Sequence, residues 1–185
     1  LRQALAAADA LLAAGRAERD VWRLTAGLYI DAGEGENAAR AAGLYISGKD
    51  DAFGLFLRAR AAFLLGHWQA ARLDAQRALS LGMLARGDEV LAHNLLARVS
   101  CSMGEVEESL REERAAFESA ETLEDKASSW SNSLSALHYV EREPQFMLDA
   151  ARRYGDLFKG VPRMKRAPKR RGKIRVGYIS PDFTF

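Results

Sequence analysis

A glycine that is followed five residues later by a small residue recurs along the chain and constrains its fold more than any other feature. The three pairs are Gly33 with Ala38, Gly66 with Ala71, and Gly104 with Ser109. The glycines are 33 and 38 residues apart. Against a repeat of about 34 residues, the second interval carries about four extra, which we place in a loop around residues 84–87. Such a period predicts stacked units, each burying its apolar face against its neighbours.

Bulky and small apolar residues fit the same register. They are Trp22, Ala26 and Tyr29 before Gly33; Leu55 and Ala59 before Gly66, with Ala75 and Ala78 after it; and Leu96 and Ala97 before Gly104, with Ala116 after it. A small residue on each helix lets two helices approach closely, and a large residue from a neighbour fills the remaining gap. An alanine-rich helical protein could show some of these matches by chance, but the first set argues against it because it combines two aromatic residues with the turn glycine.

These units resemble tetratricopeptide repeats, which implies an all-α superhelix. We expect an orphan helix over 1–15, repeat units over about 19–52, 53–86 and 90–123, and therefore a repeat region over 1–126. Ala4, Ala8 and Leu11 have the spacing of a second helix, so we expect Leu1 to be an internal position of a longer protein. The third unit is degenerate, with polar residues at several core positions; these are His93, Ser100, Ser109 and Glu113.

The sequence changes character after the repeats. Over 127–160 we predict a junction helical hairpin, with Pro144 in the first turn of its second helix. That helix should bury four residues spaced by four: Phe146, Ala150, Tyr154 and Phe158. A basic linker follows over 161–172. Residues 173–185 contain an alternating apolar pattern, which predicts one isolated strand. The strand either belongs to a sheet completed beyond Phe185 or is loosely ordered.

Three segments near the end carry a more specific resemblance. They are residues 130–132 with 136–139, residues 151–155, and residues 173–183, which include RVGYISPDF. They resemble the domain junction in bacterial proteins similar to O-linked N-acetylglucosamine transferase, the Spindly-type group. The resemblance implies a parent glycosyltransferase of the GT-B type that uses a UDP-sugar as donor. Transfer to a Ser or Thr hydroxyl would invert the configuration at the anomeric carbon of the sugar.

The resemblance assigns no catalytic residue to this chain. In the family, the histidine implicated in catalysis would follow Phe185, and the residues that bind UDP lie in a second lobe. We therefore expect no catalytic, cofactor-binding or metal site here, and a UDP-sugar donor only for the parent. The repeats would present an acceptor protein or peptide to the catalytic domain. The rival hypothesis is a stand-alone adaptor that binds a peptide or a partner helix without catalysis.

The resemblance also implies a peptide-binding groove lined by the first helices of the repeats. Its candidate residues are Arg23, Phe53, Phe56, Arg60, Asn94 and Arg98. Arg60 and Arg98 occupy equivalent positions, so two stacked guanidinium groups could clamp a carboxylate. Alternatively, each arginine pairs with a neighbouring acidic residue. The family's asparagine ladder is replaced by Leu24, Leu57 and Leu95, which puts that mode of peptide binding in doubt.

The remaining composition narrows the function classes. Residues 163–175 hold eight of the 27 basic residues and no acidic residue, so the rest of the chain is acidic, with 19 basic against 25 acidic residues. No aromatic residue interrupts this basic segment, which favours a solvated linker, or a strap on the acidic repeats, over nucleic-acid binding. His67, His93 and His138 lack metal-ligand spacing.

The cysteine content and the hydropathy suggest where the chain resides. The single cysteine, Cys101, fits a reducing compartment and is expected to be unreactive. We find no apolar run of the roughly 20 residues that would span a membrane and therefore expect a cytoplasmic protein. Apolar surface at the two ends of the chain could drive self-association.

Overall fold

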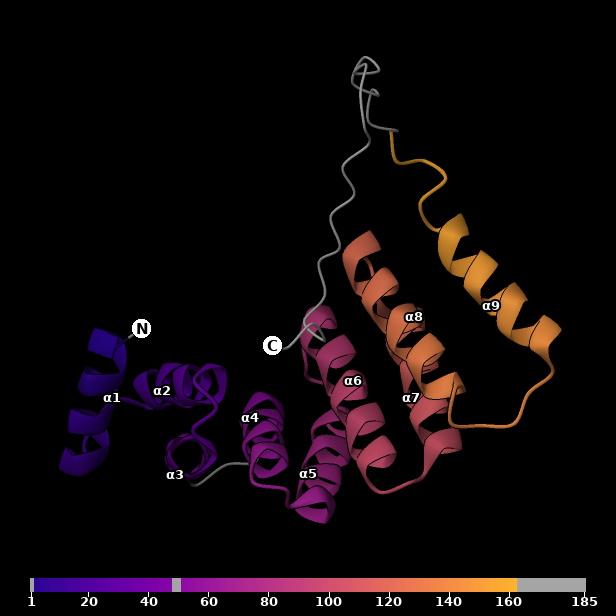
Figure 1. The fold of residues 1–185 in the computed structure, drawn as a ribbon. Coiled ribbons are helices and arrows are strands. Elements are labelled where there is room, and N and C mark those ends of the chain that lie inside the picture. The colour runs from indigo at the N-terminus through magenta and orange to yellow at the C-terminus, as the bar shows by residue number, and fades with distance from the viewer. Residues whose placement is uncertain (1, 48–50, 163–185) are drawn as a thin grey trace, which may run out of the picture.

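In a computed structural model of the protein, which describes residues 2–47 and 51–162, every regular element is an α-helix. The helices are α1 (Arg2–Ala14), α2 (Arg19–Asp31), α3 (Gly35–Ile46), α4 (Ala52–Leu64), α5 (Trp68–Ser80), α6 (Arg86–Ser102), α7 (Val106–Ser119), α8 (Leu123–Leu137) and α9 (Pro144–Asp156). They follow one another across Figure 1 in sequence order, each beside its neighbours in the chain. The strand expected within 173–185 and the linker residues 163–172 lie outside the described residues.

The hairpins α2–α3, α4–α5 and α6–α7 each turn on one of the repeat glycines. Gly33, Gly66 and Gly104 have φ angles of 78°, 74° and 79°, which residues with a Cβ rarely adopt. In each turn the glycine N–H donates to the carbonyl three residues back, and the next N–H donates to the carbonyl five residues back from itself, at 2.8–3.1 Å. This Schellman arrangement pairs carbonyls that the helix end would leave free. The glycine spacing therefore sets the repeat spacing.

Alanines allow the close approach of the paired helices. Those with no exposed surface include Ala26, Ala38, Ala41, Ala42, Ala59, Ala71, Ala75, Ala78, Ala92, Ala97 and Ala116. Trp22, Tyr29, Leu55 and Leu96 are buried beside them, so the core predicted for the three units is confirmed. Of the three core positions expected in α1, Ala8 is buried and Leu11 is half-buried, but Ala4 is exposed.

Helix α6 is one turn longer than the other first helices. It has 17 residues against 13 in α2 and in α4, and all three helices end two residues before their turn glycine. The extra residues therefore form the N-terminal turn of α6. The loop expected around 84–87 was wrong for Arg86 and Gly87, which are helical. Four residues make about one 3.6-residue turn, so the added turn does not rotate the rest of the helix. The remaining residues of α6 therefore direct the same side to the core as those of α2 and α4.

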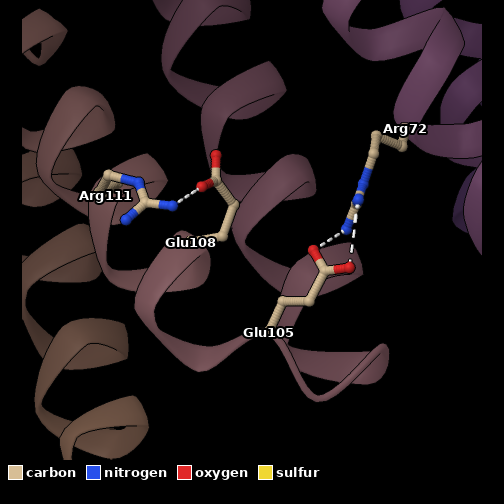
Figure 2. A network of polar contacts seen from close by, with 4 residues as sticks. All are labelled: Arg72, Glu105, Glu108 and Arg111. Atoms are coloured by element: carbon tan, nitrogen blue, oxygen red, sulfur yellow. Dashed lines mark hydrogen bonds and ion pairs between the residues drawn. The ribbon is translucent and has the colours of Figure 1, made fainter.

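Polar contacts join consecutive repeats. Arg72 of α5 donates two hydrogen bonds to the Glu105 carboxylate, which precedes α7, as Figure 2 shows. The Arg72 side chain is 19% exposed, so this pair lies at the edge of the repeat interface. A second pair in the same view, Glu108 with Arg111, lies within α7 and is more exposed. The first pair therefore connects two repeats, whereas the second supports one helix.

The last hairpin, α8–α9, is held by fewer buried groups. Trp130 of α8 donates its indole N–H to the Ala150 carbonyl at 3.0 Å. Helix α9 contains no buried residue, and Phe146 is 50% exposed. The expectation that its four regularly spaced residues are buried was wrong. Tyr154 and Phe158 instead stack edge to face on one another, with ring centroids 5.3 Å apart.

No helix in the described part of the chain is both long enough and apolar enough to cross a membrane.

Candidate functional site

Three arginines and three phenylalanines pair along the faces of α2, α4 and α6. Arg23 lies over the Phe53 ring with the guanidinium carbon 5.7 Å from its centroid, and Arg60 lies over Phe56 at the same distance. Arg98 lies over the ring of Phe63 at 4.3 Å. We call these six residues the first-helix face. Each contact holds a planar cation against an aromatic ring and leaves N–H donors free for a ligand.

Arg60 of α4 and Arg98 of α6 both lie over rings of α4. Their ring partners, Phe56 and Phe63, are seven residues apart on α4, which is about 10 Å along the helix axis. Arg60 also contacts Asp31 at 3.5 Å, but Asp31 is largely exposed. Arg98 makes no ion pair with any residue in the described part of the chain. The alternative of neutralisation by neighbouring acids therefore applies weakly to Arg60 and not to Arg98.

Two predicted groove residues have structural contacts. Phe56 is buried, with its ring beneath Arg60, so a ligand would meet the guanidinium rather than the ring. Asn94 accepts a hydrogen bond of 3.3 Å from the Ser129 hydroxyl, which ties α6 to α8. Of the ladder positions, Leu24 is 64% exposed whereas Leu57 and Leu95 are buried, so the three leucines do not form a continuous lining.

A hollow of about 410 Å³ adjoins this face and contains two of the predicted residues. Its lining is Arg23, Tyr45, Asp51, Ala52, Phe53, Met83, Leu84, Ala85 and Asp88. Sequence reasoning missed the wall formed by residues 83–88, which belong to the loop before α6 and to the extra turn of α6. The long glycine interval was the available signal, but it was assigned to a loop.

The two acidic side chains of the hollow differ in their surroundings. Asp51 accepts a hydrogen bond from the Gly54 N–H at 2.8 Å and pairs with Arg19 at 2.9 Å. Burial raises the pKa of Asp51, but these partners outweigh it and hold the pKa below its usual value. Asp88 has no ion-pair partner among the described residues. Burial raises its pKa, and the charges of Arg60 and Arg23 oppose that rise only in part.

A buried carboxyl group lies in the third repeat. Glu113 is 3% exposed and follows its turn glycine by nine residues, as the buried Ala42 and Ala75 follow theirs. Its Oε2 atom has no hydrogen-bond partner. Burial raises the pKa of Glu113 to about 8, although hydrogen bonding to Asn132 of α8 opposes the rise. The group is therefore largely protonated at neutral pH.

A second hollow, of about 540 Å³, lies between α7, α8 and α9. Aromatic residues on its walls include Phe117, Trp130 and Phe146. Phe146 and Ala150 of α9, which were expected to be buried, border this hollow.

The histidines and the cysteine do not converge. His67 precedes α5 and His138 follows α8, and both are exposed. His93 contacts Glu112 of α7 at 2.7 Å, which joins the two helices of one hairpin. Cys101 is a free, exposed thiol. The described residues contain no group of three or more acidic, histidine or cysteine side chains that could hold a metal ion.

The fold has counterparts among solved structures. A crystal structure of MamA protein matches with a TM-score of 0.62 and 18% identity, covering 89% of this chain and 87% of that chain. A second crystal structure of MamA matches with a TM-score of 0.52 and 16% identity, covering 82% and 89% of the respective chains. At these identities the likeness shows the fold alone. The arrangement fits a tetratricopeptide-type helical repeat. No protein-family model and no curated protein matches the chain.

Proposed function

We propose that this chain is a protein-interaction repeat region whose first-helix face binds a peptide segment of an acceptor protein. The observation that carries the proposal is the row of arginine–phenylalanine contacts on α2, α4 and α6. The three guanidinium groups are held over rings and remain at least partly exposed, so their N–H donors are accessible to a ligand. Guanidinium groups bind carboxylates through paired hydrogen bonds, so acidic peptide segments are the expected ligands.

Charge reversal on α4 and α6 tests the proposal. An array of acidic twelve-residue peptides would supply the ligand, and fluorescence anisotropy would measure its affinity for the purified chain. The double variant Arg60→Glu with Arg98→Glu should bind at least about tenfold more weakly, because two charge-assisted contacts are lost. The matched control is Arg114→Glu with Arg152→Glu, which makes the same charge change at exposed positions away from this face. Equal binding by wild type and the first-helix-face variant would contradict the proposal.

We further propose that the parent of this repeat region is a protein O-glycosyltransferase that uses a UDP-sugar. This part rests on the resemblance of residues 130–139, 151–155 and 173–183 to the family junction. The first two segments lie in or beside α8 and within α9, and the third lies outside the described residues. The likeness to MamA does not bear on it. The alternative is an adaptor that binds a peptide or partner helix without catalysis.

The two alternatives differ in what the parent protein does with a nucleotide sugar. The full-length protein would be incubated with UDP-N-acetylglucosamine and a peptide selected on the array, and the peptide mass would be measured. A glycosyltransferase should add one sugar mass to a serine or threonine of the peptide and release UDP. Tight peptide binding without either product would support the adaptor.

A further inference from the structure

The extra turn of α6 forms a wall of the 410 Å³ hollow. In the first two units the first helix begins fourteen residues before its turn glycine, but α6 begins eighteen residues before Gly104. The added residues 86–89 include Asp88, and the residues just before the turn contribute Met83, Leu84 and Ala85 to the lining. A four-residue difference between otherwise similar repeats thus produces one side of the hollow.

Two side chains of opposite charge line this hollow without forming an ion pair. Arg23 of α2 lies over the Phe53 ring, and Asp88 of α6 lies within the electrostatic influence of Arg23 and Arg60. Within residues 2–47 and 51–162, neither Arg23 nor Asp88 has an ion-pair partner. By contrast, Glu89 of the same turn is paired with Arg86 at 3.6 Å and accepts a hydrogen bond from Ser119. Glu89 is therefore engaged within the protein, whereas the Asp88 carboxylate is available to a ligand.

Apolar side chains line part of the hollow beside these charges. Phe53 is half-buried beneath Arg23, and Met83 is 80% exposed. Exposed methionine and aromatic side chains suit the side chains of a peptide because they are apolar and adaptable. The hollow thus offers the cation of Arg23, apolar side chains and the anion of Asp88, while its second carboxylate, Asp51, is paired with Arg19.

We propose that this hollow binds a peptide segment with an acidic residue facing Arg23, a basic residue facing Asp88 and an apolar residue between them. This inference rests on the proposed function and specifies its ligand, because the arginines of α4 and α6 alone would select acidic segments without a basic residue. Charge complementarity at both walls fixes the direction of the peptide along the face. A purely acidic segment would place a carboxylate against Asp88 and bind less well.

Three matched sets of fluorescein-labelled octapeptides test this ligand. Every peptide carries one leucine flanked by Glu and Lys, by two Glu, or by two Lys, with the flanking residues one to three positions away and in both orders. Affinities for the purified chain would be measured by anisotropy at low salt. Glu–Leu–Lys peptides in one order should bind most tightly. Asp88→Asn should weaken them about tenfold and leave the two-Glu set unchanged or tighter. Asp88→Lys should make the two-Glu set the preferred one.

The matched control is Glu89→Gln, which removes one charge from the same turn outside the hollow and should leave all affinities unchanged. If the two-Glu set binds the wild type as tightly as the mixed set, and Asp88→Asn changes nothing, this inference fails while acidic peptide binding stands. If no set binds, and the acidic array shows no loss with the reversal on α4 and α6, the proposed function fails as well.

Discussion

The Tyr29 hydroxyl donates a hydrogen bond of 2.7 Å to Asp9 Oδ1 and thereby joins α1 to the first complete hairpin. The tyrosine ring is fully buried, whereas Asp9 lies on the exposed side of α1. Burial, followed by the contact with Asp9, raises the pKa of Tyr29 to about 12. Because this bond connects α1 to α2, its removal measures how strongly the first helix is held to the first hairpin.

Replacing Tyr29 with Phe should lower the free energy of unfolding by about 1 kcal/mol, the typical net value of such a hydrogen bond. Hydrogen exchange of the α1 amides should accelerate more than exchange in α4. Tyr139→Phe, at a position 75% exposed, is the control and should change neither quantity. Because the folded pKa is raised above 10, the tyrosine's contribution is present below pH 10 and is lost as pH rises through about 12. A titration of all tyrosines near pH 10 would contradict this.

Glu113→Ala should stabilise the protein, most strongly at alkaline pH. The substitution restores the alanine found at the equivalent positions of the other repeats and removes an oxygen that has no partner. The wild-type carboxyl has a folded pKa of about 8 against an ordinary value of 4.5, so stability is greatest below pH 4.5 with respect to this group and falls as pH rises through 8.

Urea unfolding at pH 6 and pH 9 measures this effect. The wild type should lose stability on the order of 3 kcal/mol relative to Glu113→Ala between acidic and alkaline conditions, since each pKa unit corresponds to about 1.4 kcal/mol. Glu118→Gln removes an exposed acid from the same helix and should show no such pH dependence. If the stability of Glu113→Ala depended on pH as strongly as that of the wild type, Glu113 would not titrate as described.

Gly54→Ala should destabilise the packing of α4 against α3. A Cβ atom at Gly54 would lie 2.7 Å from Ile46 Cγ1 and 2.9 Å from Tyr45 Cδ1, closer than such atoms approach. We expect a loss of about 1–3 kcal/mol. Gly43→Ala is the matched control in a neighbouring helix, with open space around the new methyl group. It should gain about 0.5–1 kcal/mol from helix propensity. Thermal unfolding of both variants would show shifts of opposite sign; a shift in the same direction would contradict the packing argument.

Arg72→Met should loosen the contact between the second and third repeats. The bidentate pair with Glu105 is partly shielded and spans two repeats, so we expect a loss of about 1 kcal/mol. Arg111→Met removes only an exposed pair within α7 and should cost less than about 0.5 kcal/mol. A double-mutant cycle between Arg72 and Glu105 isolates the pair. A coupling energy near zero would mean that apolar packing alone joins these repeats.

Sequence reasoning named three candidate arginines but not all of the rings that they contact. Arg23, Arg60 and Arg98 were recognisable because the turn glycine fixes the phase of each helix, and Phe53 follows from the same phase. Phe63 was missed because it serves Arg98 of the next repeat, a contact between residues 35 positions apart. The exposure of Phe146 was missed for a related reason, since periodicity indicates an apolar stripe but not whether a partner covers it.

The sequence by itself determined the helical hairpins and their order, because glycine turns and apolar periodicity act over a few residues. Only the tertiary structure decided how the four extra residues of the third repeat are used. A loop and a helical turn satisfy the same glycine spacing, but the helical turn adds backbone hydrogen bonds and places Asp88 and Glu89 at the favourable end of the helix dipole. Asp88 thereby reaches the hollow that Arg23 lines, and this juxtaposition depends on how α2 and α6 pack around α4.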